Sequence, residues 1–298
     1  MRLNVIVTDK SNRSVMNLRQ EDFRVEEDGV PQAITYFSTE AVPVSYALVV
    51  DNSGSMKDLL ETLARTAASL MAANQPRDEA SLLRFVSSEQ VNVLVDFTTD
   101  PYALARGLSS MRTEGGQTAV IDGVYLGVEQ VAGRRAEETN RRRALVLLTD
   151  GEDRSSYYKI SELEKLLDKS DVQVFAIGII TNLDKEGGII RKSARENAVK
   201  LLNKLAQETG GRVFYPQKMR DMIFAVNEIS RDLRTQYVIG YQPTNGNRDG
   251  KFRKVKVRLS AAAGDGRDVH VREGYFAPGG KPGEKNESKE KRPRPRLP

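Results

Sequence analysis

The sequence predicts an α/β protein in which a doubly wound, mostly parallel six-stranded sheet is inserted into a small β-sandwich. Between residues 44 and 234, apolar runs of strand length alternate with helix-like spacing, which is typical of a parallel sheet covered by helices on both faces. The flanking segments show strand-like patterns without helical spacing. Each flank has too few strands to be stable alone, so we expect the two flanks to pair into one sandwich.

The elements of the central segment follow from apolar spacing. Val44 to Asp51 is a continuous apolar run, as expected for a strand buried on both faces. Apolar side chains then recur every three to four residues from Leu59 to Met71, which predicts a helix. The remaining predictions are strands at 80–86 and 91–97 joined as a hairpin, helices at 101–110 and 119–133, a strand at 143–150, a helix around 163–167, a strand at 172–179, a helix at 198–208, a strand at 212–215 and a helix at 219–234.

The flanks predict the strands of the sandwich. Phe252 to Leu259 alternates apolar and polar residues strictly, so one face is buried and the other is wet. Further strands are predicted at 3–8, 23–26, 33–37, 237–241 and 269–271. The predicted boundaries are 1–42 and 235–277 for the sandwich, 43–234 for the inserted domain and 278–298 for a tail.

The composition excludes several classes of protein. A chain of 298 residues with 39% apolar content can bury a sizeable core, and no run approaches the ~18 to 20 apolar residues that a membrane-spanning helix needs. The absence of cysteine excludes disulfides and thiolate metal sites. Seven Lys or Arg and three Glu lie between Gly279 and Pro298, so most of the net charge of +5 belongs to this tail. We therefore expect a disordered tail and no nucleic-acid-binding face.

Oxygen-bearing side chains follow the first predicted strand. Asp51, Ser53 and Ser55 form a D-x-S-x-S turn, and Gly54 lets the backbone fold so that both serines point the same way. Short polar turns recur by chance, so this turn alone is weak evidence for a metal site.

Two later oxygen donors strengthen the case. Thr118 precedes a predicted helix, and Asp150 closes the fourth predicted strand. If the first and fourth strands are adjacent where the winding reverses, three loops converge on one position. An all-oxygen site suits Mg²⁺ or Mn²⁺, with Ca²⁺ less favoured because it takes more ligands.

This combination resembles the von Willebrand factor A (VWA) domain, whose metal-ion-dependent adhesion site (MIDAS) uses a D-x-S-x-S turn, a later threonine and a later aspartate. The resemblance spans roughly residues 44 to 232. The flanks are similar to a bacterial, largely acidobacterial, family of VWA-related proteins through Arg2 to Asp9, Glu21 to Phe23 and Glu27 to Gly29. The resemblance implies metal ligands at Asp51, Ser53, Ser55, Thr118 and Asp150.

The resemblance also implies a function. In that family the aspartates often act through bound waters, so one coordination position stays open and a partner's Asp or Glu carboxylate completes the shell. Related bacterial proteins are commonly exported, which favours an extracytoplasmic location, with a cytoplasmic one as the alternative.

Residues near these donors have open interpretations. We expect Asp122 to hydrogen-bond the D-x-S-x-S turn from outside the ligand set, with capping or solvation as alternatives. Glu152 and Asp153 are expected to cap the following helix, and the segment 141–143 to be a solvated, basic helix end. The segment 182–192 reads as a mobile loop that helps to choose the partner.

Catalysis is not expected. A Ser-His-Asp hydrolase needs a base beside its nucleophile, but the only histidine, His270, lies in a strand of the carboxyl-terminal flank. An aspartyl-phosphate mechanism at Asp51 would need a second acid two residues later to protonate the leaving group, and Ser53 occupies that position. We expect a cation-dependent protein-binding module, with a scaffold protein bearing a non-functional metal site as the alternative and a metal-dependent phosphatase third.

Overall fold

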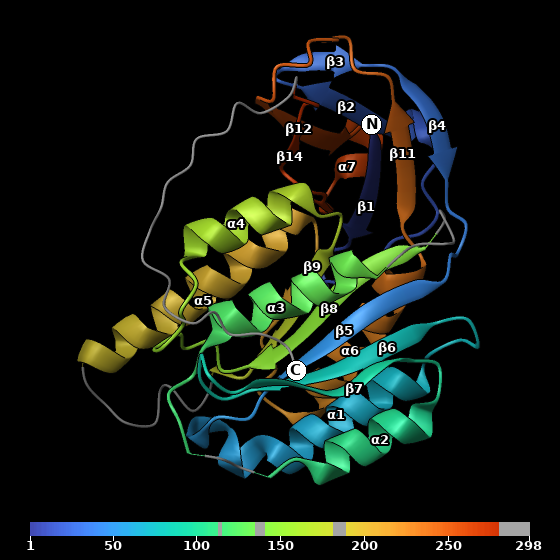
Figure 1. Cartoon of the computed structure of the whole chain (residues 1–298). Helices are drawn as coiled ribbons and strands as arrows, with labels where there is room; N and C mark the ends of the chain where they lie inside the picture. Colours follow the sequence, from blue (N-terminus) through green and yellow to red (C-terminus); the bar gives the residue numbers. More distant parts are fainter. Residues whose placement is uncertain (113–114, 135–140, 181–188, 280–298) are drawn as a thin grey trace.

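The computed structural model describes residues 1–112, 115–134, 141–180 and 189–279, which form three sheets and their helices (Figure 1). The predicted tail and most of the predicted 182–192 loop lie outside these residues. In the part of the chain that is described, no helix has the length and apolar character needed to cross a membrane.

The central sheet has six strands in the order β10-β9-β8-β5-β6-β7. All neighbours are parallel except β6 and β7, which form the predicted hairpin. β5 lies between β6 and β8, so the winding reverses there. The strands are β5 (Val44–Asp51), β6 (Glu79–Phe85), β7 (Val91–Thr98), β8 (Arg142–Thr149), β9 (Gln173–Gly178) and β10 (Val213–Phe214). The predicted doubly wound α/β fold is confirmed.

Helices cover both faces of this sheet. One face packs on α1 (Leu60–Ala72), α2 (Pro101–Ser110) and α6 (Met219–Arg234), and the other on α3 (Val120–Gly133), α4 (Ile160–Lys169) and α5 (Ile189–Thr209). α3 can approach the sheet closely because a Cβ on Gly123 would lie 2.7 Å from the Phe85 ring. α5 begins at Ile189, so the predicted helix at 198–208 is too short and the predicted loop up to residue 192 is too long.

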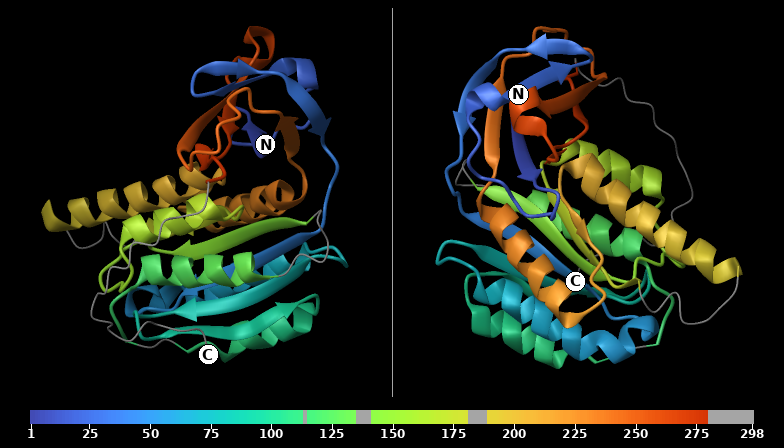
Figure 2. Two further views of the ribbon diagram at one scale, coloured as in Figure 1. Left: turned by 45° about the horizontal axis from the view of Figure 1, so that its top comes forward. Right: turned by 180° about the vertical axis from the view of Figure 1, so that it is seen from behind.

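The two flanks form a sandwich of two four-stranded sheets, in the orders β13-β1-β11-β4 and β14-β12-β2-β3 (Figure 2). Each sheet takes two strands from each flank, so neither flank can bury its apolar face without the other. The strands are β1 (Arg2–Thr8), β2 (Phe23–Glu27), β3 (Val30–Gln32), β4 (Ile34–Ser38), β11 (Tyr237–Tyr241), β12 (Phe252–Leu259), β13 (Asp268–His270) and β14 (Gly274–Phe276), with short helices η1 (Gln20–Asp22) and α7 (Ala261–Gly264).

The two chain crossings between the domains lie together at the amino end of β8. There the backbone N–H of Arg142 donates to Pro43 O at 2.9 Å, and its guanidinium donates to Leu233 O at 2.8 Å. Arg142 is only 4% exposed, so the expectation of a solvated helix end at 141–143 is wrong. Burial lowers the pKa of Arg142 to about 10.

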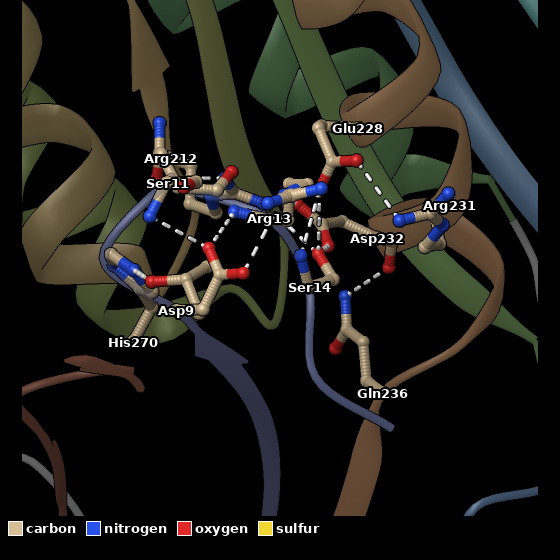
Figure 3. Close-up of polar contacts among 12 residues, drawn as sticks. Asp9, Ser11, Arg13, Ser14, Arg212, Glu228, Arg231, Asp232, Gln236 and His270 are labelled. Carbon is tan, nitrogen blue, oxygen red and sulfur yellow. Dashed lines mark hydrogen bonds and ion pairs between the residues drawn. The ribbon is translucent and has the colours of Figure 1, made fainter. Parts of the chain in front are cut away.

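A buried ion-pair network joins the two domains (Figure 3). Arg212, just before β10, pairs with Asp232 and lies 3.7 Å from Glu228, both on α6. It also donates to Asn12 O at 2.7 Å, while Ser14 donates its backbone N–H to Glu228 at 2.8 Å. Segments that are about 200 residues apart in the chain are thereby held in one polar core.

Candidate metal centre

The D-x-S-x-S turn lies at the carboxyl end of β5, as predicted. Asp51 is the last residue of that strand and is 0% exposed, and Ser53 is 1% exposed. The backbone N–H of Ser53 donates to Asp51 Oδ1 at 3.0 Å, which folds the turn back on the carboxylate. Ser55 lies in η2 (Gly54–Leu59), but its side chain is outside the described residues.

Asp150 follows β8, the parallel neighbour of β5, and is 1% exposed. Its Oδ1 accepts from the backbone N–H of Glu152 at 3.0 Å. Burial, and next the nearby Asp150 carboxylate, raise the pKa of Asp51 well above its usual range, against the lowering effect of hydrogen bonds from Thr149 and Ser53. Two buried carboxylates therefore face each other across the reversal of the sheet.

Thr118 lies on the loop before α3 and is 4% exposed. Its carbonyl oxygen accepts from the backbone N–H groups of Arg154 at 2.8 Å and Ser155 at 3.1 Å. The loop that carries Asp150 thus contacts the loop that carries Thr118. The structure brings Asp51, Ser53, Thr118 and Asp150 to one edge of the sheet.

Asp122 and Asp153 both bind a loop or helix next to the proposed ligands. Asp122 is 0% exposed and accepts from the backbone N–H groups of Tyr157 and Tyr158, so its carboxylate binds the loop after β8. Burial raises the pKa of Asp122, and those two hydrogen bonds lower it. Asp153 accepts from the N–H of Ile121 in α3 at 3.1 Å, so it caps α3 and not the following helix.

The sequence reasoning missed two residues that hold the turn. Thr149 Oγ1 donates to Asp51 Oδ2 at 2.5 Å and accepts from the N–H of Gly151 at 3.0 Å, which ties the two strand ends together. The side-chain amide of Asn52 donates to Arg112 O at 2.6 Å. Their positions inside the D-x-S-x-S and T-D-G motifs were the available clue, since motif neighbours share the same tight backbone.

These residues fit a divalent cation. A buried carboxylate beside a second one is unfavourable without a counter-charge, and no described Lys or Arg forms an ion pair with Asp51. Among the described residues no group of three or more His, Cys, Asp or Glu could hold a metal, so the remaining donors would be hydroxyls and water. That donor set suits a hard, six-coordinate cation such as Mg²⁺.

Comparison with known proteins agrees with the fold. The profile of the von Willebrand factor type A domain matches residues 47–229. No curated protein matches the chain.

The solved structures that match the chain are distant in sequence. A von Willebrand factor type A protein from Catenulispora acidiphila is 14% identical with a TM-score of 0.51, covering 88% of this chain and 74% of that one. An aerotolerance-related membrane protein from Bacteroides fragilis is 21% identical with a TM-score of 0.48, covering 63% and 99%. A mussel byssus matrix protein with a zinc-occupied MIDAS motif is 17% identical with a TM-score of 0.50, covering 65% and 49%.

Proposed function

The chain belongs to the von Willebrand factor type A domain family, and we propose that it is a divalent-cation-dependent protein-binding module. The observation that carries the proposal is the buried pair Asp51 and Asp150, set among hydroxyl donors without an ion-pairing Lys or Arg at Asp51. Ser53, Ser55 and Thr118 are the other proposed ligands. The mussel protein's zinc-occupied motif is further support for a metal at this edge.

For this function the protein only has to hold the metal ion where a partner can reach it. The proposed ligands would hold Mg²⁺ or Mn²⁺, and the ion would supply a hard, positively charged centre that can bind a carboxylate. If Asp51 and Asp150 act through water, as the resemblance to the family implies, the ion would be bonded mainly to neutral oxygens and would keep affinity for a further anion. We therefore propose that the partner is a protein that presents an Asp or Glu side chain to this edge.

Contacts of the described residues favour binding over catalysis. A hydrolase built on Ser53 would need a nearby base, but His270 Nε2 lies 3.1 Å from Thr8 Oγ1 in the sandwich. Burial and Arg212 lower the pKa of His270 to about 4. We propose that the chain is not an enzyme.

The first test is metal binding by calorimetric titration with Mg²⁺ and with Mn²⁺. We expect one site per chain, and Thr118→Ala should weaken it by more than the roughly 10- to 100-fold seen on losing an outer-shell partner. Thr209→Ala is a matched control, because Thr209 is also buried but its hydroxyl accepts from the Val174 N–H at the other end of the sheet. Equal metal affinity in the wild type and Thr118→Ala would refute the proposal.

The alternative is a scaffold protein that binds through the sandwich or the tail. Capture of partners from lysate, with Mg²⁺ and again with EDTA, separates the two functions. The metal-dependent function predicts that EDTA and Thr118→Ala abolish capture and that deletion of residues 279–298 changes it little, since charges in a tail are screened beyond ~8 Å at physiological salt. The reverse pattern would favour the scaffold.

A further inference from the structure

The amino terminus of α3 is capped by another loop and not by its own residue. Ala119 occupies the N-cap position and has no side-chain oxygen. The first N–H groups of a helix need partners outside it. Here the N–H of Ile121 donates to Asp153 at 3.1 Å and the N–H of Asp122 donates to Ser156 Oγ at 3.2 Å. Both partners belong to the loop between β8 and α4.

The Asp122 carboxylate in turn binds the loop between β8 and α4. Oδ1 accepts from the N–H of Tyr158 and Oδ2 from the N–H of Tyr157, each at 2.8 Å. One helical turn later the Tyr125 ring stacks on Tyr158, with centroids 3.7 Å apart. A single fully buried side chain therefore satisfies two consecutive N–H groups of the facing loop.

The same loop contacts the proposed ligand Thr118. Besides the two N–H groups that donate to Thr118 O, Ser155 Oγ donates to Gln117 O at 2.6 Å. The loop begins at Asp150, another proposed ligand. Its two ends are thus fixed differently: Asp150 by β8, and the segment 153–158 by Asp122 and its neighbours.

We propose that Asp122 is a positioning residue of the metal centre, holding the Thr118 loop and the Asp150 loop as one unit. The inference rests on the proposed metal site and adds a residue outside the ligand set. A carboxylate is required because two N–H donors need two acceptors in one place. Asparagine would offer one oxygen and turn an N–H₂ group toward the second donor.

Asp122→Asn tests this role, with Asp78→Asn as the matched control. Asp78 is 3% exposed and also accepts from two backbone N–H groups, those of Val44 at 3.0 Å and Gln75 at 2.8 Å, at the opposite end of β5. Asp78 in addition pairs with Arg234 at 3.3 Å, so Asp78→Asn disturbs at least as many contacts as Asp122→Asn, at a similarly buried site far from the metal edge. Mg²⁺ and Mn²⁺ affinities are measured by calorimetry, and folding by circular dichroism.

Asp122→Asn should weaken metal binding by roughly 10- to 100-fold, and Asp78→Asn by less than about twofold. Wild-type affinity in folded Asp122→Asn, or equal weakening in both variants, would overturn the inference while leaving the metal site intact. Failure of Thr118→Ala to weaken binding would instead refute the metal site itself.

Ser156→Ala is the second variant, for use if Asp122→Asn does not fold. It removes the Ser156 oxygen that accepts from the Asp122 N–H and donates to Asp153 at 2.6 Å, but leaves the Asp122 carboxylate in place. Loss of these two hydrogen bonds, which act on the metal only through the loop, should weaken metal binding by about three- to tenfold. Unchanged affinity in this variant would count against the inference.

Discussion

Two pairs of buried carboxylates in this protein have different partners. At the domain junction, Asp232 and Glu228 are 0% and 3% exposed, and the buried Arg212 guanidinium pairs with both. At the carboxyl edge of the sheet, Asp51 and Asp150 are 0% and 1% exposed, and no described Lys or Arg forms an ion pair with Asp51. The chain supplies its own cation at Asp232, whereas Asp51 accepts from the Thr149 hydroxyl and the Ser53 backbone N–H.

The difference separates structural acids from binding acids. Even beside Arg212, burial raises the pKa of Asp232 to about 6, so desolvation is a strong effect in this domain. The Asp51 carboxylate meets the same desolvation with a second acid beside it. A counter-charge that is part of the chain is permanent, whereas one taken from solution can be exchanged and can also contact a partner.

The largest expected effect breaks the junction. Arg212→Met keeps much of the side-chain volume but leaves Asp232 and Glu228 buried without their cation. The free energy of unfolding should fall by about 3 to 5 kcal/mol, measured by urea denaturation. Added Mg²⁺ should not reduce the difference in the free energy of unfolding between Arg212→Met and the wild type. A loss below about 1 kcal/mol would show that the junction does not depend on its internal cation.

The second effect isolates the metal edge. At a free Mg²⁺ concentration 100 times the Kd, the wild type should gain about 2.7 kcal/mol of stability, and Asp51→Ala should gain none. Arg212→Met should keep the full gain, because its metal edge is intact. Thermal unfolding with Mg²⁺ and with EDTA measures all three proteins. A gain in Asp51→Ala equal to the wild-type gain would contradict the proposed site.

The third effect concerns pH at the junction. His270 has its pKa lowered to about 4 in the folded protein, while the unfolded chain takes up the proton near ~6.5. The stability that the neutral ring contributes is therefore complete above pH ~6.5 and is lost progressively as the pH falls toward 4. Between pH 7 and pH 5 the wild type should lose up to about 2 kcal/mol more than His270→Gln. Urea denaturation at both pH values checks this, and equal losses would remove His270 as the cause.

Local patterns in the sequence determined most of the elements and the candidate ligands. The alternation from Phe252 to Leu259 predicted β12 with its bounds, and the apolar run before Asp51 predicted β5. Both follow from periodicity, which is a property of neighbouring residues. The order of the D-x-S-x-S turn, Thr118 and Asp150 on successive loops likewise pointed to one edge of a parallel sheet, because carboxyl ends of parallel strands share an edge.

Only the tertiary structure decided what distant segments do to one another. Arg142 looked like part of a solvated basic run, but the two crossings between the domains bury it. For Asp122 the sequence left a bond to the first ligand turn, capping and solvation open, and packing gives it partners in the loop after β8. The partners of Arg212 lie in two distant segments, the loop with Asn12 and Ser14 and helix α6 with Asp232. No local pattern encodes these pairings, because hydrogen bonding and desolvation at such sites depend on which chain segments meet in space.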